Sequence, residues 1–402
     1  MLRSMYSGIS GMKNFQTKLD VIGNNIANVN TYGFKKSRVT FSDTMNQTIS
    51  GASASQENRG GTNSKQVGLG STISTIDTIH TGSSLQTTGR SLDLGINGDG
   101  YFVVKQGDAQ YYSRAGNFYL DDNGTLVTGE GLKVQSYEKG VLKDITVNVN
   151  SVLPATVTKV LEFSGNLPTK ATGSDGINQQ LKVVDKDGKE HVLDVTVTPT
   201  DALTGDWAIK ITNSSGPATG NSETFNIKVA DDGTVDVVNP TTSKILDLKS
   251  IGIGTDSHKI TLSMSGITKT GDSITLLGTP DGNTSGSLES FNIGQMGEIN
   301  GVFSNGLVKE LGKLAMAKFS NSSGLTKAGS NTFQESINSG TANINVAGNG
   351  RGTLAAGSLE MSNVDLSEEF TDMIVAQRGF QANSRIITTS DEILQELVNL
   401  KR

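Results

Sequence analysis

The two ends of the chain carry apolar residues at helical spacing, whereas the long stretch between them does not. Over residues 364–400, large apolar side chains recur every seven residues, and a companion position follows four residues after the first and the last of them. The repeat consists of Leu366, Met373, Phe380, Ile387 and Leu394, with Phe370 and Val398 in the companion position. A strict seven-residue repeat is typical of a helix packed along another helix. The pattern therefore predicts one long amphipathic helix over 364–400.

Residues 2–30 contain a second apolar series, with spacings of three and four residues and one extra three-residue step. The series consists of Leu2, Met5, Ile9, Met12, Phe15, Leu19, Ile22, Ile26 and Val29. It predicts another amphipathic helix, ending between Asn28 and Gly33 because glycine readily takes the left-handed conformation that closes a helix. We expect the two terminal helices to pair as a coiled coil, which indicates a chain built to assemble.

Three glycines lie inside the first predicted helix, at Gly8, Gly11 and Gly23. Each costs up to about 1 kcal/mol relative to alanine. We expect them to allow close approach of a neighbouring helix; the alternative is a solvent-facing side without constraint. Because such helices are marginal alone, we also expect both ends to be largely unstructured in the free monomer and to become helical against neighbours.

The middle of the chain is rich in Gly, Ser, Thr and Asn and shows strand-like alternation with hairpin turns, for example at 120–126, 135–141 and 181–192. The predicted fold class is α+β, mostly β, with two β-rich domains, the outer one inserted in the inner one. The predicted segments are a helical domain of 1–34 plus 364–402, an extended connector of 35–70, an inner β domain of 71–159 plus 290–362, and an inserted outer β domain of 160–286.

Composition excludes several classes of protein. The formal charge of -6 over 402 residues argues against nucleic acid as the main partner. The absence of cysteine excludes disulfides and thiolate metal sites. No run of 18 apolar residues exists, so no membrane insertion is expected. Residues 1–7 lack the pattern of a cleaved signal peptide, so we expect any export to use another signal.

Candidate chemistry is weak throughout the sequence. The segment 185–188 could be part of a calcium loop, but its Asp and Gly residues favour a hairpin turn. The segment 95–101 lacks the lysine and the helix of a phosphate loop. His80, His191 and His258 are scattered and no catalytic motif accompanies them. We therefore expect no enzyme activity, no catalytic residues, no metal and no cofactor. A carbohydrate-binding module stays an alternative for the Thr/Asn-rich middle, although it leaves the terminal repeats unexplained.

The segment 23–35 resembles the N-terminal signature of bacterial flagellar axial proteins of the rod and hook type. Its motif residues are Asn24, Asn25, Ala27, Asn28, Thr31, Gly33 and Phe34. Four further stretches extend the resemblance in the same order as in the family: 92–102, 112–118, 122–127 and 376–384. Independently of the resemblance, the amide and hydroxyl groups of Asn25, Asn28 and Thr31 can satisfy backbone groups where the helix ends, and Phe34 can anchor the connector.

The resemblance implies a subunit that polymerises into a hollow curved tube, with the terminal helices around a central channel and the β domains outside. Such a tube would act as a flexible universal joint that transmits torque from rod to filament. Length and the inserted 160–286 domain favour a hook subunit, with a distal rod or hook–filament junction subunit as the alternative. The implied partners are other copies of the chain, the flagellar rod, hook cap and hook–filament junction proteins, and the flagellar type III export apparatus. The implied location is the flagellum, outside the cell.

Overall fold

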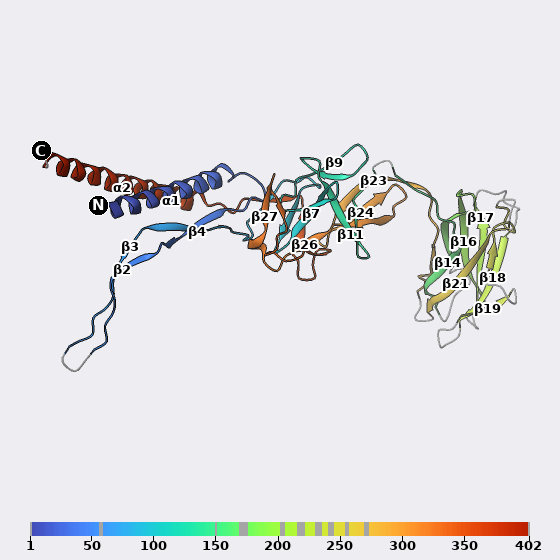
Figure 1. Ribbon diagram of the computed structural model, residues 1–402. Helices are drawn as coiled ribbons and strands as arrows, with labels where there is room; N and C mark the ends of the chain where they lie inside the picture. The colour runs from blue at the N-terminus through green and yellow to red at the C-terminus, as the bar shows by residue number, and fades with distance from the viewer. Residues whose placement is uncertain are drawn as a thin grey trace. The chain divides into compact units, whose positions relative to one another are not determined.

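The computed structural model describes residues 2–55, 59–148, 151–168, 176–201, 206–214, 222–229, 235–239, 245–253, 257–268 and 273–400. The chain divides into two compact units (Figure 1). Unit 1 comprises Met1–Asn148, Phe291–Asn300 and Glu310–Arg402, and unit 2 comprises Val149–Ser290 and Gly301–Lys309. Unit 2 is therefore inserted in the sequence of unit 1. It extends beyond the expected 160–286 and includes part of the segment expected in the inner domain.

Unit 1 contains the two terminal helices, α1 (Leu2–Ala27) and α2 (Leu366–Asn399), which pack side by side (Figure 1). They run antiparallel, because Gly8 lies against Ile387 while Lys18 forms an ion pair with Asp372. The side chain of Asp365 accepts hydrogen bonds from the backbone of the first turn and so caps the N-terminus of α2. Both helices predicted from the apolar series are confirmed, within about three residues at each end.

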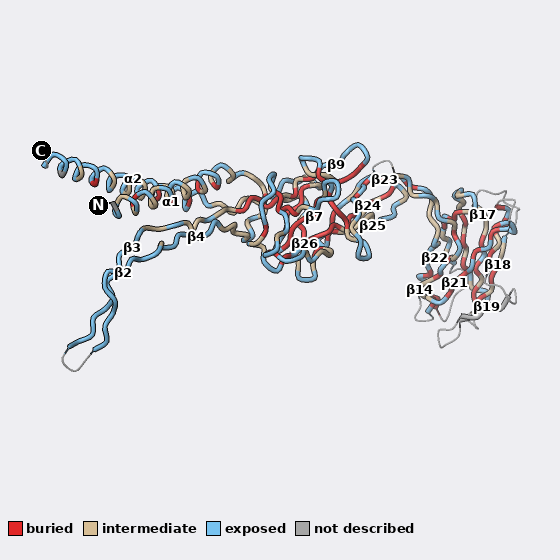
Figure 2. The backbone as a smooth tube through the Cα atoms, in the orientation of Figure 1, coloured by how far each residue is buried: buried red, intermediate tan, exposed pale blue. Residues whose placement is uncertain are grey.

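A β ribbon follows α1, where an extended connector was expected. Strand β1 (Ser37–Asp43) pairs with β4 (Ser71–Thr78), and β2 (Asn46–Ser50) pairs with β3 (Lys65–Gly68). The β1–β4 pair lies on α1, where the rings of Phe15 and Phe41 have centroids 6.2 Å apart. Every residue of β2 and β3 is exposed (Figure 2). The polar composition of 35–70 concealed these strands, because neither face of the distal ribbon is buried.

The body of unit 1 is a β-sheet core. Ten of the described strands form one sheet with the order β27-β28-β8-β7-β11-β10-β9, to which β12, β26 and β29 are added. The strands are β7 (Tyr101–Gln106), β8 (Ala109–Ser113), β9 (Phe118–Leu120), β10 (Leu126–Thr128), β11 (Lys133–Glu138), β12 (Val141–Asp144), β26 (Met316–Lys318), β27 (Thr326–Gly329), β28 (Thr332–Gln334) and β29 (Asn343–Asn345). A short 3-10 helix, η1 (Ser322–Gly324), precedes β27. An aromatic cluster of Tyr101, Tyr112, Phe319 and Phe333 is buried against this sheet.

Two short strand pairs complete unit 1 and lead back to α2. Strand β6 (Leu94–Asn97) pairs with β30 (Thr353–Ala356), and β5 (Leu85–Thr87) pairs with β31 (Ser358–Glu360). Segments from both ends of the sequence therefore meet beside the helix pair. Strands β23 (Gly286–Ile293), β24 (Glu298–Phe303) and β25 (Val308–Lys313) each contain residues of both units, and β13 (Val152–Leu153) pairs with the first residues of β23.

The core of unit 2 is a β-sandwich. A five-stranded antiparallel sheet, in the order β15 to β19, and a four-stranded sheet, in the order β20-β21-β14-β22, contribute to one apolar core around Trp207. The strands are β14 (Val160–Asn166), β15 (Ile177–Val184), β16 (Glu190–Asp201), β17 (Asp206–Asn213), β18 (Ser222–Val229), β19 (Val235–Asn239), β20 (Ile245–Asp247), β21 (Lys259–Thr268) and β22 (Leu277–Pro280). Alternate residues along the strands are buried, as in a half-exposed sheet.

The predicted hairpins at 120–126, 135–141 and 181–192 are confirmed by the pairs β9–β10, β11–β12 and β15–β16. At the third hairpin, Asp185 Oδ1 accepts hydrogen bonds from the backbone N–H groups of Asp187 and Lys189. This carboxylate therefore organises a turn. In the described part of the chain, no helix has the length and apolar character needed to cross a membrane.

Candidate assembly interface

The contact face between α1 and α2, called the seam below, contains fewer large apolar side chains of α2 than the seven-residue repeat predicted. On α2 the first row is as expected, with Met373, Phe380, Ile387 and Leu394 partly buried. The second row is Glu369, Ala376, Asn383 and Ser390, not the predicted companion position. Phe370 and Val398 are 49% and 69% exposed, and Leu366 is 40% exposed. The placement of Phe370 and Val398 in the seam was therefore wrong, because α1 approaches the small side of α2, three residues after each large side chain.

On α1, Ile22 is the buried member of the predicted series among the described side chains. Six others are partly buried: Met5, Met12, Phe15, Leu19, Ile26 and Val29. Ile9 is 47% exposed, and the side chain of Leu2 lies outside the described residues. Within one chain the pair thus leaves much of its apolar surface uncovered. This agrees with the expectation that the ends require neighbours, which stays a prediction.

Glycines at the crossing of the two helices permit their close approach. A Cβ added at Gly11 would lie 2.9 Å from the Asn383 amide, and one at Gly379 would lie 2.5 Å from the ring of Phe15. A Cβ at Gly8 would be 3.4 Å from the carbonyl oxygen of Asn383. At Gly23 there is nothing within 4 Å. Close approach is confirmed for Gly8 and Gly11, whereas Gly23 faces open space and the prediction for it was wrong.

The family motif forms the turn that joins α1 to the ribbon. Asn25 is buried; its amide nitrogen donates to the Ser37 carbonyl at 2.9 Å and to the Glu369 carboxylate at 3.2 Å, and its oxygen accepts from the Ser37 N–H. Burial raises the pKa of Glu369 above its ordinary value. Asn25 therefore ties α1, β1 and α2 together with one side chain.

The other motif residues close the helix end. Asn28 donates to the Asn24 carbonyl, and the Thr31 hydroxyl donates to the Asn28 side chain. Gly33 has a φ of 70° and donates its N–H to the Glu360 carbonyl at 2.8 Å, and Phe34 is buried. A Cβ at Gly33 would lie 2.6 Å from the backbone of residues 114–115, so glycine is required there for two reasons. Asn24 and Ala27 are exposed.

A buried charge triad lies directly after the motif, and the sequence analysis missed it. Lys35 Nζ is 2.7 Å from Glu360 Oε1, and an Arg114 guanidinium nitrogen is 3.2 Å from Glu360 Oε2. The exposed side-chain fractions of Lys35, Arg114 and Glu360 are 0%, 2% and 0%. Burial lowers the pKa of Lys35, and the Glu360 carboxylate opposes this shift. Lys35 and Arg114 stood in segments singled out in the sequence, but nothing there indicated their common partner.

His80 lies beside the triad and is neutral at physiological pH. The Tyr101 hydroxyl is 2.8 Å from His80 Nδ1, and the ring of Phe333 packs edge-on against the imidazole. Burial, together with the charges of Lys35 and Arg114, lowers the pKa of His80 to about 4. Burial also raises the pKa of Tyr101 to about 12. Both shifts favour the uncharged forms of His80 and Tyr101.

Unit 1 is expected to lose stability as the pH falls from about 6.5 to 4. The pKa of His80 is lower in the folded than in the unfolded chain, so its contribution is complete above the ordinary value of 6.5 and is lost on acidification. The loss by pH 4 is on the order of 2 kcal/mol. Urea denaturation across this range measures it, and His80→Asn, which keeps an acceptor for Tyr101, should show a flatter profile. An identical slope for the variant would contradict the assignment.

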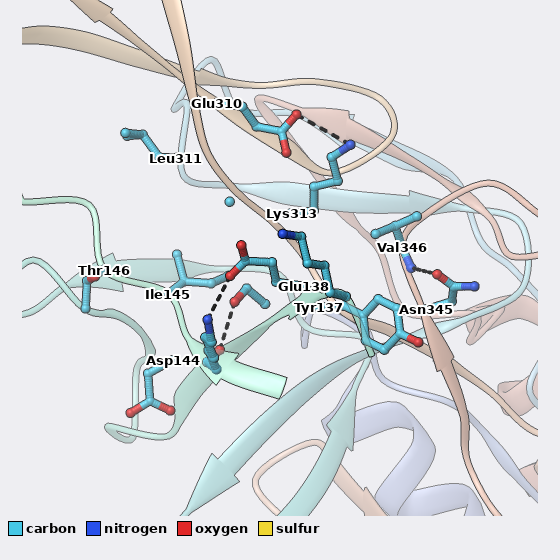
Figure 3. A pocket seen from close by; sticks show the side chains of 14 residues that line it. Tyr137, Glu138, Asp144, Ile145, Thr146, Glu310, Leu311, Lys313, Asn345 and Val346 are labelled. Carbon is cyan, nitrogen blue, oxygen red and sulfur yellow. Dashed lines mark hydrogen bonds and ion pairs between the residues drawn. The ribbon is translucent and has the colours of Figure 1, made fainter. Parts of the chain in front are cut away.

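A surface hollow in unit 1 is lined by side chains of both charges, which compensate each other. It has a volume of about 620 Å³ and is lined by side chains of β11, β12 and β25 (Figure 3). Lys143 pairs with Glu138 at 2.9 Å, and Lys313 pairs with Glu310 at 3.4 Å. Opposite charges in balance offer no focused field for a charged ligand. Among the described residues no group of three or more His, Cys, Asp or Glu side chains could hold a metal ion.

The fold and the interface define an axial structural protein, in which both ends of the chain form a helix pair beside a β-rich body. Three family models match the chain: "Flagella basal body rod protein" at residues 5–35, "Flagellar hook protein FlgE/F/G D1 domain" at 95–161, and "Flagellar basal body rod FlgEFG protein C-terminal" at 355–400. Curated relatives align over the whole chain. The chain belongs to the family of flagellar rod and hook proteins.

Among these relatives, the flagellar basal-body rod protein FlgG of Bacillus subtilis is 42% identical over 404 residues. The flagellar hook proteins FlgE of Borreliella burgdorferi and Treponema pallidum are 39% and 36% identical over 456 and 463 residues. In all three cases the alignment covers 100% of both chains. The crystal structure of the Helicobacter pylori flagellar hook protein FlgE2 matches with a TM-score of 0.53 at 14% identity, covering 69% of this chain and 100% of that one. At that identity the match shows a shared fold.

Proposed function

We propose that this chain is a structural subunit of the bacterial flagellar hook and assembles into a hollow, curved helical tube. The observation that carries the proposal is the antiparallel pair of terminal helices, whose exposed apolar side chains are left uncovered by the rest of the chain. Full-length relatives named as hook proteins support it. The assembly residues are those of the two apolar series, with Phe370, Leu366 and Val398 now facing outward toward neighbouring copies.

The proposed role of each domain follows from the order in which the domains are nested along the chain. The terminal segments 1–34 and 364–402 form the tube core around a channel, the β-rich remainder of unit 1 forms the inner domain, and unit 2 forms the outer domain. Tight helix packing at the core with polar contacts between β domains gives a tube that bends while transmitting torque. The rod, the hook cap and the hook–filament junction proteins are the proposed partners at its ends. The proposed route of delivery is the flagellar type III export apparatus, and the proposed destination is the flagellum outside the cell.

A distal rod subunit is the second candidate. It is favoured by the full-length match to the B. subtilis protein named as rod protein FlgG, at 42% identity. The two candidates differ in the mechanical form of the polymer, because a rod is a stiff shaft and a hook is a bent joint. Curved tubes outside the cell surface favour the hook, and straight ones within the basal body favour the rod.

Removing the terminal helices is expected to abolish assembly. Electron microscopy of the full-length protein should show tubes, and a variant lacking residues 1–30 and 364–402 should stay dispersed, because the polymerising surfaces are gone. The matched control lacks 160–286 instead; it should still form tubes, with altered curvature or stiffness. Tubes from the chain without its ends would refute the role of the helices. Unchanged curved tubes from the control would refute the role of the outer domain.

A further inference from the structure

The chain contains five Asn-Gly pairs, at 97–98, 123–124, 300–301, 305–306 and 349–350. Asparagine is a chemically labile residue, and a following glycine leaves its amide open to attack, because no side chain shields the glycine backbone nitrogen. Attack of that nitrogen on the asparagine side-chain carbonyl carbon closes a five-membered imide. The backbone must rotate to bring the two atoms together, so the fold decides which of the five pairs can react.

Two of the pairs are held in strands. Asn300 and Gly301 lie inside β24, which has a neighbouring strand on each side, and Gly301 is buried. Asn97 is the last residue of β6 and pairs with Thr353 of β30. Rotation of either backbone would break strand pairing, which hinders closure of the ring.

Two further pairs lie in turns where the attacking N–H group is already bonded. Gly124 is buried and donates its N–H to the Asp121 carbonyl at 2.9 Å. Gly306 donates its N–H to the Phe303 carbonyl at 2.8 Å, and the side chain of Asn305 is bound through both its nitrogen and its oxygen. These hydrogen bonds must break before the nitrogen can attack, which raises the barrier.

The pair Asn349–Gly350 has no such restraint. It occupies the centre of a two-residue turn that is closed by the bond from the Arg351 N–H to the Gly348 carbonyl, and its φ angles are 47° and 79°. Both residues are exposed, and within the described part of the chain neither the Gly350 N–H nor the Asn349 side-chain amide has a hydrogen-bond partner. The turn by itself accounts for the choice of Asn-Gly. Its reactivity depends on the groups around it.

Two cations lie against this turn. Arg351 Nη1 donates to the Asn349 carbonyl oxygen at 3.4 Å, and Lys318 Nζ donates to the Gly350 carbonyl oxygen at 2.8 Å. When the Gly350 nitrogen loses its proton, the negative charge is shared with the Asn349 carbonyl oxygen of the same peptide bond. The guanidinium is therefore placed where it stabilises the attacking anion.

The guanidinium is held in this position by the strand before the turn. Arg351 Nη2 and Nε donate to the Asn343 carbonyl at 3.1 and 3.3 Å. The acid Asp99 also approaches the segment, because its backbone carbonyl accepts from the Gly352 N–H. Its exposed carboxylate offsets one of the two positive charges, and the balance of Arg351, Lys318 and Asp99 still favours an anion.

We propose that Asn349 is a site of spontaneous deamidation, and that the fold leaves this Asn-Gly pair reactive while it protects the other four. The Gly350 nitrogen gives its proton to solvent and attacks Cγ of Asn349; the Cγ–Nδ2 bond breaks, and the leaving nitrogen takes a proton from water and departs as ammonia. Water then opens the imide at either carbonyl, which gives aspartate or isoaspartate. The net reaction consumes one water and releases one ammonia, and it does not depend on the proposed function.

The product differs from the original chain in two ways. A carboxylate at position 349 places a negative charge beside Arg351 and Lys318. In isoaspartate the backbone also runs through the former side chain, which lengthens the connection between β29 and β30 by one atom. Unit 1 of an old molecule is therefore marked at a defined place without any enzyme.

Peptide mapping of the full-length protein tests the proposal. The protein is incubated under native conditions in mildly alkaline buffer, sampled over time and cleaved with a glutamate-specific protease; the peptide 336–360 contains this Asn-Gly pair and no other. Mass spectrometry with fragmentation should show conversion at Asn349 about tenfold faster than at the other four asparagines, because its turn opens more easily than their strands and bonded turns. In urea, where the fold is lost, the five pairs should react at similar rates.

The role of the guanidinium is tested with Arg351→Gln, which keeps a polar side chain without the charge. Conversion at Asn349 should be about threefold slower, an effect limited by solvent screening at an exposed site. The matched control, Arg378→Gln, removes an exposed arginine of α2 and should leave the rate unchanged.

Three results would overturn the proposal. Equal or faster conversion at any of the other four asparagines in the native protein would mean that the fold does not select Asn349. An advantage of Asn349 that persists in urea would assign its reactivity to the local sequence alone. Conversion in Arg351→Gln at the original rate or faster would remove the guanidinium from the reaction.

Discussion

Replacing Glu360 with alanine is expected to destabilise unit 1 by about 3–5 kcal/mol, because Lys35 and Arg114 are then left buried without a counter-charge. The carboxylate also accepts a hydrogen bond from the Ser83 backbone N–H at 3.2 Å. Loss of the carboxylate therefore removes the contacts that join the segments around Lys35, Ser83, Arg114 and Glu360. Glu360→Gln keeps the shape but not the charge and should show a smaller loss.

The two units allow an internal control for this measurement. The chain has one tryptophan, Trp207, and it lies in the core of unit 2. In Glu360→Ala, amide exchange should show that unit 1 unfolds at a lower urea concentration. The urea transition seen by tryptophan fluorescence, which reports on unit 2, should not move. Glu138→Gln, which removes the acid of an exposed pair with Lys143, should leave both transitions unchanged. Equal behaviour of Glu360→Ala and the unmodified chain would mean that the triad contributes no net stability.

Gly379→Val is expected to lower polymer yield more than tenfold. Even a single added Cβ would lie 2.5 Å from the Phe15 ring, and valine adds two further carbons in the tightest part of the α1–α2 crossing. Overpacking of this kind costs about 1–3 kcal/mol, and we expect the helix pair to be only marginally stable within a single chain. The mass of polymer recovered by sedimentation measures the effect.

The matched control is Gly23→Ala on the other helix. Nothing lies within 4 Å of a Cβ there, so alanine meets no steric resistance and gains up to about 1 kcal/mol in helix propensity. This variant should assemble as well as the unmodified chain or better. If Gly379→Val also assembles normally, the crossing in a polymer differs from the one within a single chain.

The terminal helices and the hairpins could be predicted because their signals are local. The seven-residue repeat and the Asp/Gly turns depend on residues close in sequence, and the structure has them where the patterns placed them. The face of α2 that meets α1 could not be predicted in the same way. Large side chains such as Phe370 marked one side, but Ala376 and Gly379 let α1 approach another, and small residues carry no signal in an apolar count.

The charge triad was beyond prediction for a different reason. Lys35 and Arg114 lie in the motif segments 23–35 and 112–118. Glu360, in contrast, lies in the short strand β31, which has no recognisable motif. Its partners are 325 and 246 residues away in the sequence. Only the closing of β31 on β5, with the N–H of Gly33 bonded to the Glu360 carbonyl, brings the three charges together.

That long separation has a consequence for the order in which the chain can fold. A nascent chain holds Lys35 and Arg114 long before residue 360 exists, and during that interval neither base can be buried without an unpaired charge. Contacts between residues so distant in sequence form late, because the entropy of closing the loop must be overcome first. Pairing of β31 with β5 is therefore the step that completes the fold of unit 1. Until β31 is present, the segment around Lys35 stays open and the C-terminal end of α1 is not held in place. We therefore expect incomplete chains to join a polymer poorly.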